Sequence, residues 1–577
     1  MMTPDVKLLK SALGEEKADI GFLNGILFNP FTCEWLKLDF FVKSGIIVGI
    51  ADSEGDVSGS ESSENSAENN PGSGYRAERY IDLKGAKVIP GLIDSHVHIE
   101  SSLLTPFEYA RLVIPHGTTA VIADPHEIAN VAGIEGVNFM IRDSEKTPLS
   151  FYYMAPACVP ATPMDRAGAD LDSEALKELA ASESIIGLGE MMNFPGVIFG
   201  DSEVQKKLEI FDIIDGHSPQ LSGKELNAYI SQGIESDHEC VSREEALEKL
   251  RKGMYIYLRE GSTEKNLSEI AGIVNCYNSH RCSFCTDDRH ADMLYNDGHI
   301  DDCIRKAVSA GISTETAIKM ATLSPAERFG LKDRGALSPG RRADFCTLAD
   351  SEEFRVLDTY IRGVNFTDIQ RDEKVSFNSV FNAGRLTEDD LKISGSGNAR
   401  IIGINQGQII TDLIVEDIDS SGIPDLNRDI IKAVVCDRYR AGGCGVGLIN
   451  GLKIREGAIC ASISHDSHNI VAAGASDAEI VRAVNLVRES SGGMAAVCGD
   501  DSFVLPLDIG GIMSSGSYAE VIDGLKKLEE ITKKTGSVKD PFMYLSFIAL
   551  TVIPALRITE RGLFDVSEFS DVPLFKL

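Results

Sequence analysis

The sequence predicts an α/β protein built around a (β/α)8 TIM barrel, with a small sheet domain beside it and an α+β domain after it. Eight apolar, β-branched runs alternate with amphipathic stretches between residues 87 and 288, which is the rhythm of a parallel barrel. Short strand-like segments stand on both sides of that region. From residue 400 onward, strand runs mix with glycine-rich turns and predict a separate domain.

A composite β-sheet domain is expected from residues 1–86 together with residues 331–372. Residues 19–50 consist of short apolar runs broken by Gly, Asn and Pro, and similar runs return over residues 335–365. Strands before and after a barrel can pair in one small sheet. Residues 51–78 are mostly Ser, Glu, Asn and Gly, so we expect a disordered insertion there that has no effect on the chemistry.

The barrel is expected over residues 87–330. The spacing of apolar residues marks Ser242–Lys252 and Asp172–Ala180 as helices, and residues 313–330 predict two short helices split at Ser324-Pro325. The eight candidate strands are Lys87–His98, Thr118–Pro125, Ser150–Cys158, Ile185–Met192, Phe211–Pro219, Gly233–Glu239, Met254–Gly261 and His280–Asp288.

The remaining residues, 373–577, are expected to form one α+β domain without an internal repeat. Its glycine-rich stretch Gly443–Gly447 has neither the spacing of a P-loop nor that of a dinucleotide-binding fingerprint. We therefore interpret this stretch as a turn or as a place where two chain segments approach closely.

The balance of charge excludes two classes of partner. The chain has 56 Lys and Arg against 88 Asp and Glu, which is a formal net charge of −32. Nucleic acids and anionic membranes are bound by clustered Lys and Arg, so neither is expected as a partner. The expected partners are a small-molecule substrate, water and further copies of the chain in a homo-oligomer, a dimer or larger.

A cytoplasmic location with reduced thiols is expected. The first residues contain no apolar signal region, and the longest apolar run, Phe542–Leu556, is too short to span a bilayer and is interrupted by Pro554. The 12 cysteines are expected to be buried and reduced. Their one close pair, Cys282 and Cys285, is typical of core thiols on a strand rather than of a zinc or redox motif.

Polar side chains gather where the candidate strands end. His96 and His98 close the first strand, and residues at positions i and i+2 of a strand point to the same side. A barrel brings the carboxyl ends of its strands together, so the residues at these ends should meet. The others are Glu190, His217, Asp237, His238, Glu239, Asp287 and Asp288.

Four imidazoles, a carboxylate able to bridge and a terminal aspartate are typical of a site for two divalent ions of the Mn, Fe or Zn type. Such ions lower the pKa of bound water and polarise the group under attack. An adjacent carboxylate can take the proton of the water and pass it to a leaving group. Asp287 is the first candidate for this proton transfer and Glu239 is the second. The pattern predicts a metal-dependent hydrolase.

Several motifs carry a resemblance to known families. Pro90–His98 resembles the opening strand of the amidohydrolase superfamily, and Leu337–Phe345 resembles the closing segment of its composite sheet domain. Other stretches, spread from about residue 19 to the end, are similar to the microbial adenine deaminase family. These stretches are His98–Ser102, Asp124–Val131, Gly187–Val197, Asp215–Pro219, Ser236–Glu239, Cys285–Arg289, Ser464–Ile470 and Leu505–Leu507.

The resemblance implies hydrolytic deamination of adenine to hypoxanthine and ammonia in purine salvage, by a hydroxide that two bound Mn²⁺ or Fe²⁺ ions activate, with Zn²⁺ less favoured. His96 and His98 would then bind one ion, and Asp287 would complete the site. His217 and His238 would bind the second ion. Glu190 would act in catalysis as the bridge, in the place where many superfamily members use a carboxylated lysine.

Five further residues are candidates for contact with the substrate. His126 follows the second candidate strand and could touch the substrate, orient a neighbour or support the turn before it. His465 and His468 lie in the polar segment Ser464–Ile470, which could cap the barrel mouth or form a network inside its own domain. Glu100 and Asp288 stand beside the implied ligands and complete the set.

Three alternatives stay open. Another hydrolase of the superfamily, dihydroorotase-like or cytosine deaminase-like, would keep the ligands and change the residues that face the substrate. A zinc deaminase with an H-x-E and a P-C-x-x-C signature fits His98–Glu100 and Cys282–Cys285 superficially, but Arg281 stands where the proline belongs. A barrel without catalysis would lack one of the ligands, and all are present.

Overall fold

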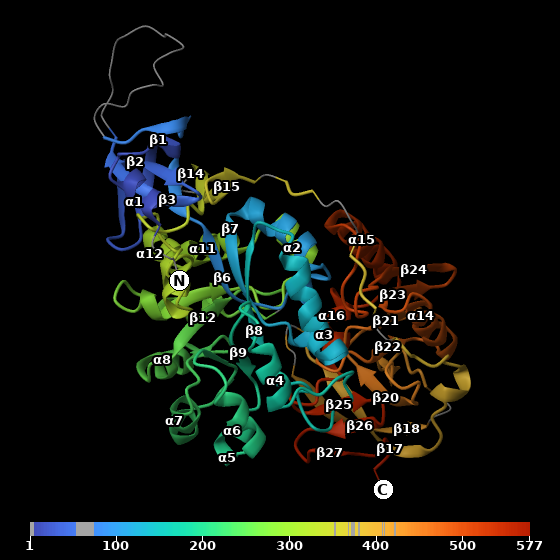
Figure 1. Ribbon diagram of the computed structural model, residues 1–577. Coiled ribbons are helices and arrows are strands. Elements are labelled where there is room, and N and C mark those ends of the chain that lie inside the picture. The colour runs from blue at the N-terminus through green and yellow to red at the C-terminus, as the bar shows by residue number, and fades with distance from the viewer. Residues whose placement is uncertain are drawn as a thin grey trace.

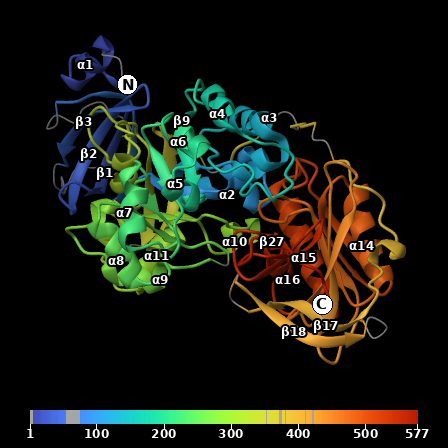
Figure 2. The same cartoon turned by 90° about the horizontal axis from the view of Figure 1, so that it is seen from below.

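The computed structural model describes residues 5–53, 74–262, 264–350, 353–366, 368–370, 375–378, 381–406, 408, 410–419 and 423–576. A sheet near the N-terminus, a barrel and a second large sheet with its helices follow one another along the chain (Figure 1). Seen from below, the barrel lies between the other two parts (Figure 2). The predicted α/β barrel fold is confirmed.

The first sheet joins strands from before and after the barrel. Pro90 of β5 lies opposite Phe345 of β14, and Phe345 packs with Phe22 and Phe40 in the core of the sheet. A short helix, α1 (Val6–Ala12), packs on β3. In spatial order the strands are β16 (Val364–Asn365), β15 (Arg355–Ile361), β14 (Phe345–Asp350), β5 (Lys87–Pro90), β1 (Ala18–Asn29), β2 (Glu34–Lys43) and β3 (Ile46–Asp52), with β4 (Ala77–Asp82) beside β1.

The insertion expected at residues 51–78 has ordered ends, which corrects its boundaries. Ala51 in β3 pairs with Asp39, and Ala77 in β4 pairs with Ala18, so backbone hydrogen bonds to neighbouring strands order both ends. The centre of the expected insertion, residues 54–73, lies outside the described residues.

Eight short parallel strands form the barrel. They make two sheets that backbone contacts join, because Val97 bridges Asp287 in parallel and Glu235 N–H donates to the carbonyl of Ile214. Apolar side chains, among them Ile93 and Tyr257, pack together in one buried cluster from several of these strands. The strands are β6 (Leu92–Val97), β7 (Thr118–Ala123), β8 (Ser150–Ala155), β9 (Ile185–Met191), β10 (Ile214–Gly216), β11 (Ser236–Asp237), β12 (Tyr255–Arg259) and β13 (Cys282–Cys285).

The first expected strand, Lys87–His98, is wrong as a single element. Gly91 divides it into β5, which belongs to the first sheet, and β6, which belongs to the barrel. The N–H of Gly91 donates to Asp344 O, and a Cβ at this position would lie 2.2 Å from Thr119 Oγ1. Only glycine fits where the chain passes between the two parts.

Helices cover the barrel where the apolar spacing predicts them. Asp172 and Ser242 accept a backbone N–H at the N-caps of α4 and α8, as their residue types favour. The expected break at Ser324-Pro325 is displaced, because Pro325 lies in the first turn of α13, where proline is tolerated. The helices are α2 (Pro106–Val113), α3 (His126–Ser144), α4 (Ser173–Leu179), α5 (Phe194–Phe199), α6 (Ser202–Leu208), α7 (Gly223–Ser231), α8 (Arg243–Arg251), α9 (Leu267–Ile270), α10 (Ala291–Asn296), α11 (Ile300–Ser309), α12 (Thr314–Met320) and α13 (Leu323–Arg328).

The C-terminal part is an eight-stranded sheet with helices packed on it. Backbone contacts tie it to the barrel, since Ser514 N–H donates to Leu103 O. The helices are α14 (Asp477–Glu489), α15 (Tyr518–Lys534) and α16 (Pro541–Phe547). The strands are β18 (Thr411–Asp419), β17 (Ser396–Ile404), β20 (Cys444–Asn450), β19 (Ile430–Cys436), β22 (Ile470–Gly474), β21 (Ala458–Ala461), β23 (Gly493–Cys498) and β24 (Asp501–Pro506), and then a small sheet of β25 (Leu556–Thr559), β26 (Gly562–Asp565) and β27 (Ser570–Asp571).

Two sequence features of this part have a structural explanation. The glycine-rich stretch Gly443–Gly447 is a place of close approach, because a Cβ on Gly445 would lie 2.0 Å from Thr559 O. The apolar run Phe542–Leu556 divides between α16, a turn and the start of β25. Among the described residues, no helix combines the length and apolar character needed to cross a membrane.

The expectation of reduced thiols throughout is wrong at one pair. Cys436 and Cys444 form a disulfide, because they lie opposite one another where β19 pairs with β20. The other cysteines of the described residues are free thiols. Cys282 and Cys285 are buried in β13, and burial raises the pKa of the Cys282 thiol to about 12. Their interpretation as core thiols is confirmed.

Candidate active site

The six side chains expected to bind metal come together at the carboxyl ends of the barrel strands. All are buried except that of His217, which is 26% exposed. Each of them contacts at least one of the others within 3.5 Å. They are His96 in β6, His98 after it, Glu190 in β9, His217 after β10, His238 after β11 and Asp287 after β13.

Glu190 lies at the centre of this group. Its Oε2 is 2.7 Å from His217 Nδ1 and 3.2 Å from His238 Nε2, and its Oε1 is 3.3 Å from His98 Nε2. Burial by itself would raise the pKa of Glu190, but the surrounding imidazoles outweigh it and hold the pKa well below its usual range. The carboxylate is therefore charged and has ligand-type groups on both oxygens.

Asp287 joins the first and last strands of the barrel. Its N–H donates to the carbonyl of His96, and its own carbonyl accepts from the N–H of His98. Its Oδ1 lies 3.0 Å from His98 Nε2 and 3.5 Å from His96 Nε2. Arg259 Nη1 donates to Oδ2 at 2.6 Å. Burial opposes the charge of Asp287, but Arg259 and the imidazoles prevail and lower its pKa well below the usual range.

The donor set fits a divalent metal. His98 Nδ1 donates to the carbonyl of Asp124 at 2.9 Å, which leaves the lone pair on Nε2, the atom that faces Glu190 and Asp287. Several triads here have ligand atoms within 4.8 Å of one another, among them His96 with His98 and Asp287, and His96 with Glu190 and His238. Imidazoles and carboxylates in this arrangement are ligands for Mn, Fe or Zn.

Glu239, the second candidate for proton transfer, is held by an arginine that the sequence did not indicate. Arg259 bonds both oxygens of Glu239 and also Asp287, so one guanidinium connects the two carboxylates. Glu239 Oε1 lies 3.8 Å from His238 Nε2 and 3.9 Å from His217 Nδ1. Arg259 is the last residue of strand β12, and this position at a strand end was the signal that could have identified it from the sequence.

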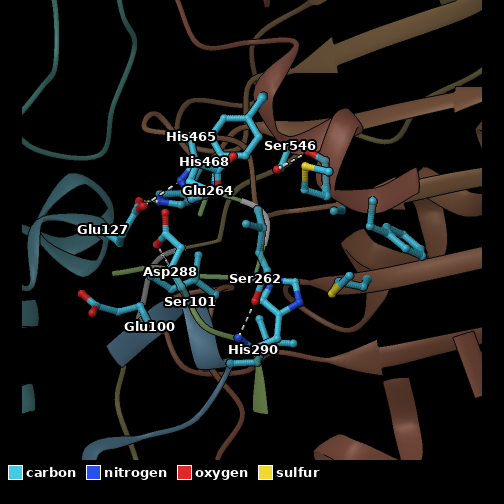
Figure 3. A pocket seen from close by; sticks show the side chains of 18 residues that line it. Glu100, Ser101, Glu127, Ser262, Glu264, Asp288, His290, His465, His468 and Ser546 are labelled. Carbon is cyan, nitrogen blue, oxygen red and sulfur yellow. Dashed lines mark hydrogen bonds and ion pairs between the residues drawn. The ribbon is translucent and has the colours of Figure 1, made fainter. Parts of the chain in front are cut away.

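A pocket opens between the barrel and the C-terminal part (Figure 3), and Asp288, which follows Asp287 in the chain, lines it. It has about 670 Å³ of space, including its opening to solvent. Four of the five expected substrate residues line it: Glu100, Asp288, His465 and His468. Ser101 Oγ donates to Asp288, and burial raises the pKa of Glu100 to about 7.

His126, the fifth expected substrate residue, lies between the cluster and the wall of the pocket. Its Nδ1 is 3.5 Å from Glu190 Oε1, and its Nε2 is 3.6 Å from Glu127 Oε1. It is not one of the described residues that line the pocket. This placement fits a residue that orients its neighbours better than one that touches a ligand in the pocket.

Comparison with known proteins shows which family the chain belongs to. Residues 87–366 match the model of the amidohydrolase family, and residues 408–570 match that of the adenine deaminase C-terminal domain. An adenine deaminase of Methanoculleus marisnigri is 53% identical over 539 residues, which are 93% of this chain and 100% of that protein. The chain belongs to the adenine deaminase family.

Further members of the adenine deaminase family match over nearly the whole chain. An adenine deaminase of Methanoregula boonei is 52% identical over 571 residues, covering 98% of each protein. A solved structure titled as an adenine deaminase aligns with a TM-score of 0.43 and 17% identity, over 61% of this chain and 100% of that one.

In this member of the adenine deaminase family, the segment Ser464–Ile470 of the C-terminal part contacts the barrel. His465 Nδ1 lies 2.7 Å from Glu127 Oε1, and His468 Nε2 bonds Glu127 Oε2. Its polar groups are therefore not confined to a network inside their own domain. Sequence reasoning missed Glu127, although it stands next to His126 in a motif at a strand end, which was the signal available.

Proposed function

We propose that the chain hydrolyses adenine to hypoxanthine and ammonia. The observation that carries the proposal is the convergence of four imidazoles, Glu190 and Asp287 at the carboxyl end of the barrel, beside a pocket. Membership of the adenine deaminase family supports the choice of substrate. A role in purine salvage follows from this reaction, because the product is a reusable base.

We further propose two divalent ions, Mn²⁺ or Fe²⁺, as the resident metals. His96, His98 and Asp287 would hold one ion, and His217 and His238 the other. Glu190 would bridge them, which its contacts through both oxygens support. When bound, such ions lower the pKa of a water and polarise the carbon–nitrogen group under attack.

The chain's own residues would move the protons. Hydrolysis forms a bond from the water oxygen to C6 of the purine and breaks the bond from C6 to the exocyclic nitrogen. Asp287, kept ionised by Arg259, would take one proton from the water and deliver it to the departing nitrogen, which leaves as ammonia, while the second proton of the water ends on N1 of the hypoxanthine product. Glu239 shares Arg259 and would stabilise that guanidinium while Asp287 carries the proton.

The pocket would hold the base. Glu100, Asp288 and His465 present polar groups to it from the barrel and the C-terminal part. His126 would act through Glu190 and Glu127, which it approaches on both sides. We assign residues 87–330 to catalysis, except Lys87–Pro90, which joins residues 1–86 and 331–372 in a supporting sheet. Residues 373–577 would close the pocket.

Ammonia release from adenine tests the proposal directly. Protein stripped with a chelator is assayed with and without added Mn²⁺, and cytosine, guanine, adenosine and dihydroorotate are assayed beside adenine. Release that depends on Mn²⁺ and is confined to adenine supports the proposal. Release from another compound would keep the metal chemistry and refute the substrate. No release from protein that holds two ions would refute the activity.

A further inference from the structure

The two histidines of the C-terminal segment bind one carboxylate but differ in their protonation. Ser464 N–H lies 3.4 Å from His468 Nδ1, and a backbone N–H can only donate. His468 Nδ1 is therefore an acceptor, its proton sits on Nε2, and that proton is donated to Glu127. This tautomer leaves no lone pair on Nε2 for a metal, so the group of Glu127, His465 and His468 is a hydrogen-bonded clamp.

His465 occupies a different position in the clamp. Its Nδ1 donates to Glu127 Oε1, and its ring stacks on Phe547 with centroids 4.7 Å apart and planes inclined by 18°. The ring is thus fixed by contacts on one edge and one face. No atom of the described residues bonds its Nε2, and the side chain is 12% exposed where it lines the pocket.

The contact of His465 Nδ1 with the Glu127 carboxylate at 2.7 Å favours the protonated ring, in which Nε2 is also a donor. Burial opposes protonation of the ring, but Glu127 outweighs it and raises the pKa of His465 to about 9. Asp288, Asp466 and the neutral His468 are the other titratable groups near it. Asp288 also lines the pocket and offers acceptor oxygens (Figure 3).

We infer that His465 Nε2–H donates a hydrogen bond to an unprotonated ring nitrogen of the bound purine, while Glu127 and His468 act only as positioning residues. The inference rests on the proposed function for the choice of ligand. It gives the C-terminal part a direct role in recognition of the base, because His465 lines the pocket and its Nε2 has no partner among the described residues.

Deaza-adenines test this inference. In 1-, 3- and 7-deazaadenine a ring nitrogen is replaced by C–H, which cannot accept a hydrogen bond. Equilibrium binding is measured by calorimetry in metal-loaded enzyme carrying Asp287→Asn, so that turnover does not interfere. One of the three analogues should bind roughly 10- to 100-fold more weakly than adenine, the range for a hydrogen bond from a charged donor.

The variant His465→Phe then identifies the donor, because phenylalanine keeps a ring beside Phe547 but has no N–H to donate. This variant should weaken the binding of adenine by the same factor. The affinity of the analogue that lacks the contacted nitrogen should stay unchanged. Glu127→Gln should weaken the binding of adenine as well, and the double variant should bind adenine no more weakly than His465→Phe alone, because Glu127 acts on the base only through His465. His280 is exposed and does not line the pocket, so His280→Phe is the matched control and should bind adenine like the parent.

Two results would overturn the inference. Equal binding of adenine and all three analogues to enzyme with an intact His465 would show that no ring nitrogen accepts a hydrogen bond, and this result needs no variant of the clamp. Equal weakening of the binding of adenine and of every analogue by His465→Phe would show a structural role only. The metal content and melting temperature of each variant are measured alongside. An enzyme that binds adenine with this pattern but releases no ammonia before Asp287 is changed would refute the proposed function and not this inference.

Discussion

Glu190 is the residue on which the proposed centre depends most, since four imidazoles lie within 3.5 Å of its two oxygens. We predict that Glu190→Gln lowers bound metal below two ions per chain and lowers activity in parallel, because the bridge loses its charge. Metal is counted by elemental analysis beside the ammonia assay. Glu209→Gln, on an exposed glutamate, is the control. Full metal content with full activity in Glu190→Gln would contradict the bridging role.

Asp287 combines a proposed ligand role with proton transfer. We predict that Asp287→Asn lowers kcat by about 10²- to 10⁴-fold, the usual contribution of a positioned acid or base. The amide can still accept hydrogen bonds but cannot take a proton, so activity should fall by more than the metal content does. A loss of activity in strict proportion to lost metal would mean that Asp287 is a ligand only.

At the scale of elements, Gly91 decides how the sheet and the barrel connect. A Cβ there would lie 2.2 Å from Thr119 Oγ1 and 2.8 Å from Thr119 Cβ. We predict that Gly91→Ala lowers the free energy of unfolding by about 1–3 kcal/mol, the typical cost of overpacking. Thr119→Ala should restore part of this loss. Urea denaturation measures both, and Gly443→Ala, where a Cβ meets nothing within 4 Å, should be neutral.

At the scale of the whole molecule, buried carboxylates make stability depend on pH. His116 and Arg305 outweigh the burial of Asp301 and lower its pKa from 3.8 to about 2. Because the folded pKa is the lower one, the stabilisation is complete above the unfolded pKa and is lost as the pH falls through the folded one.

We therefore predict that Asp301→Asn lowers the free energy of unfolding by about 2 kcal/mol near neutral pH, and that the difference from the parent protein shrinks between about pH 4 and pH 2. Chemical denaturation across this pH range measures it. A difference that stays constant down to the lowest pH would mean that the carboxylate charge contributes nothing.

Much of the barrel could be predicted from local patterns. Apolar runs predicted the strands, and the residues after them predicted the centre, since parallel strands necessarily bring their carboxyl ends together. His96, His98 and Glu190 could be found in this way because strand and side-chain direction depend on neighbours in sequence. The exact ends of the strands could not be predicted in this way. At Gly91, for example, the close contact with Thr119 decides where β5 ends and β6 begins.

Sequence by itself determined the apolar strands of the barrel, the polar residues at their ends and the family motifs, because each is a pattern among residues near one another in the chain. Tertiary structure alone decided which partners these groups meet. Glu127 meets His465 across 338 positions of sequence, and Arg259 meets both Glu239 and Asp287. The pairing of β19 with β20, which places Cys436 opposite Cys444, likewise forms only on folding. Such contacts depend on how strands and domains pack, and no local period records that packing.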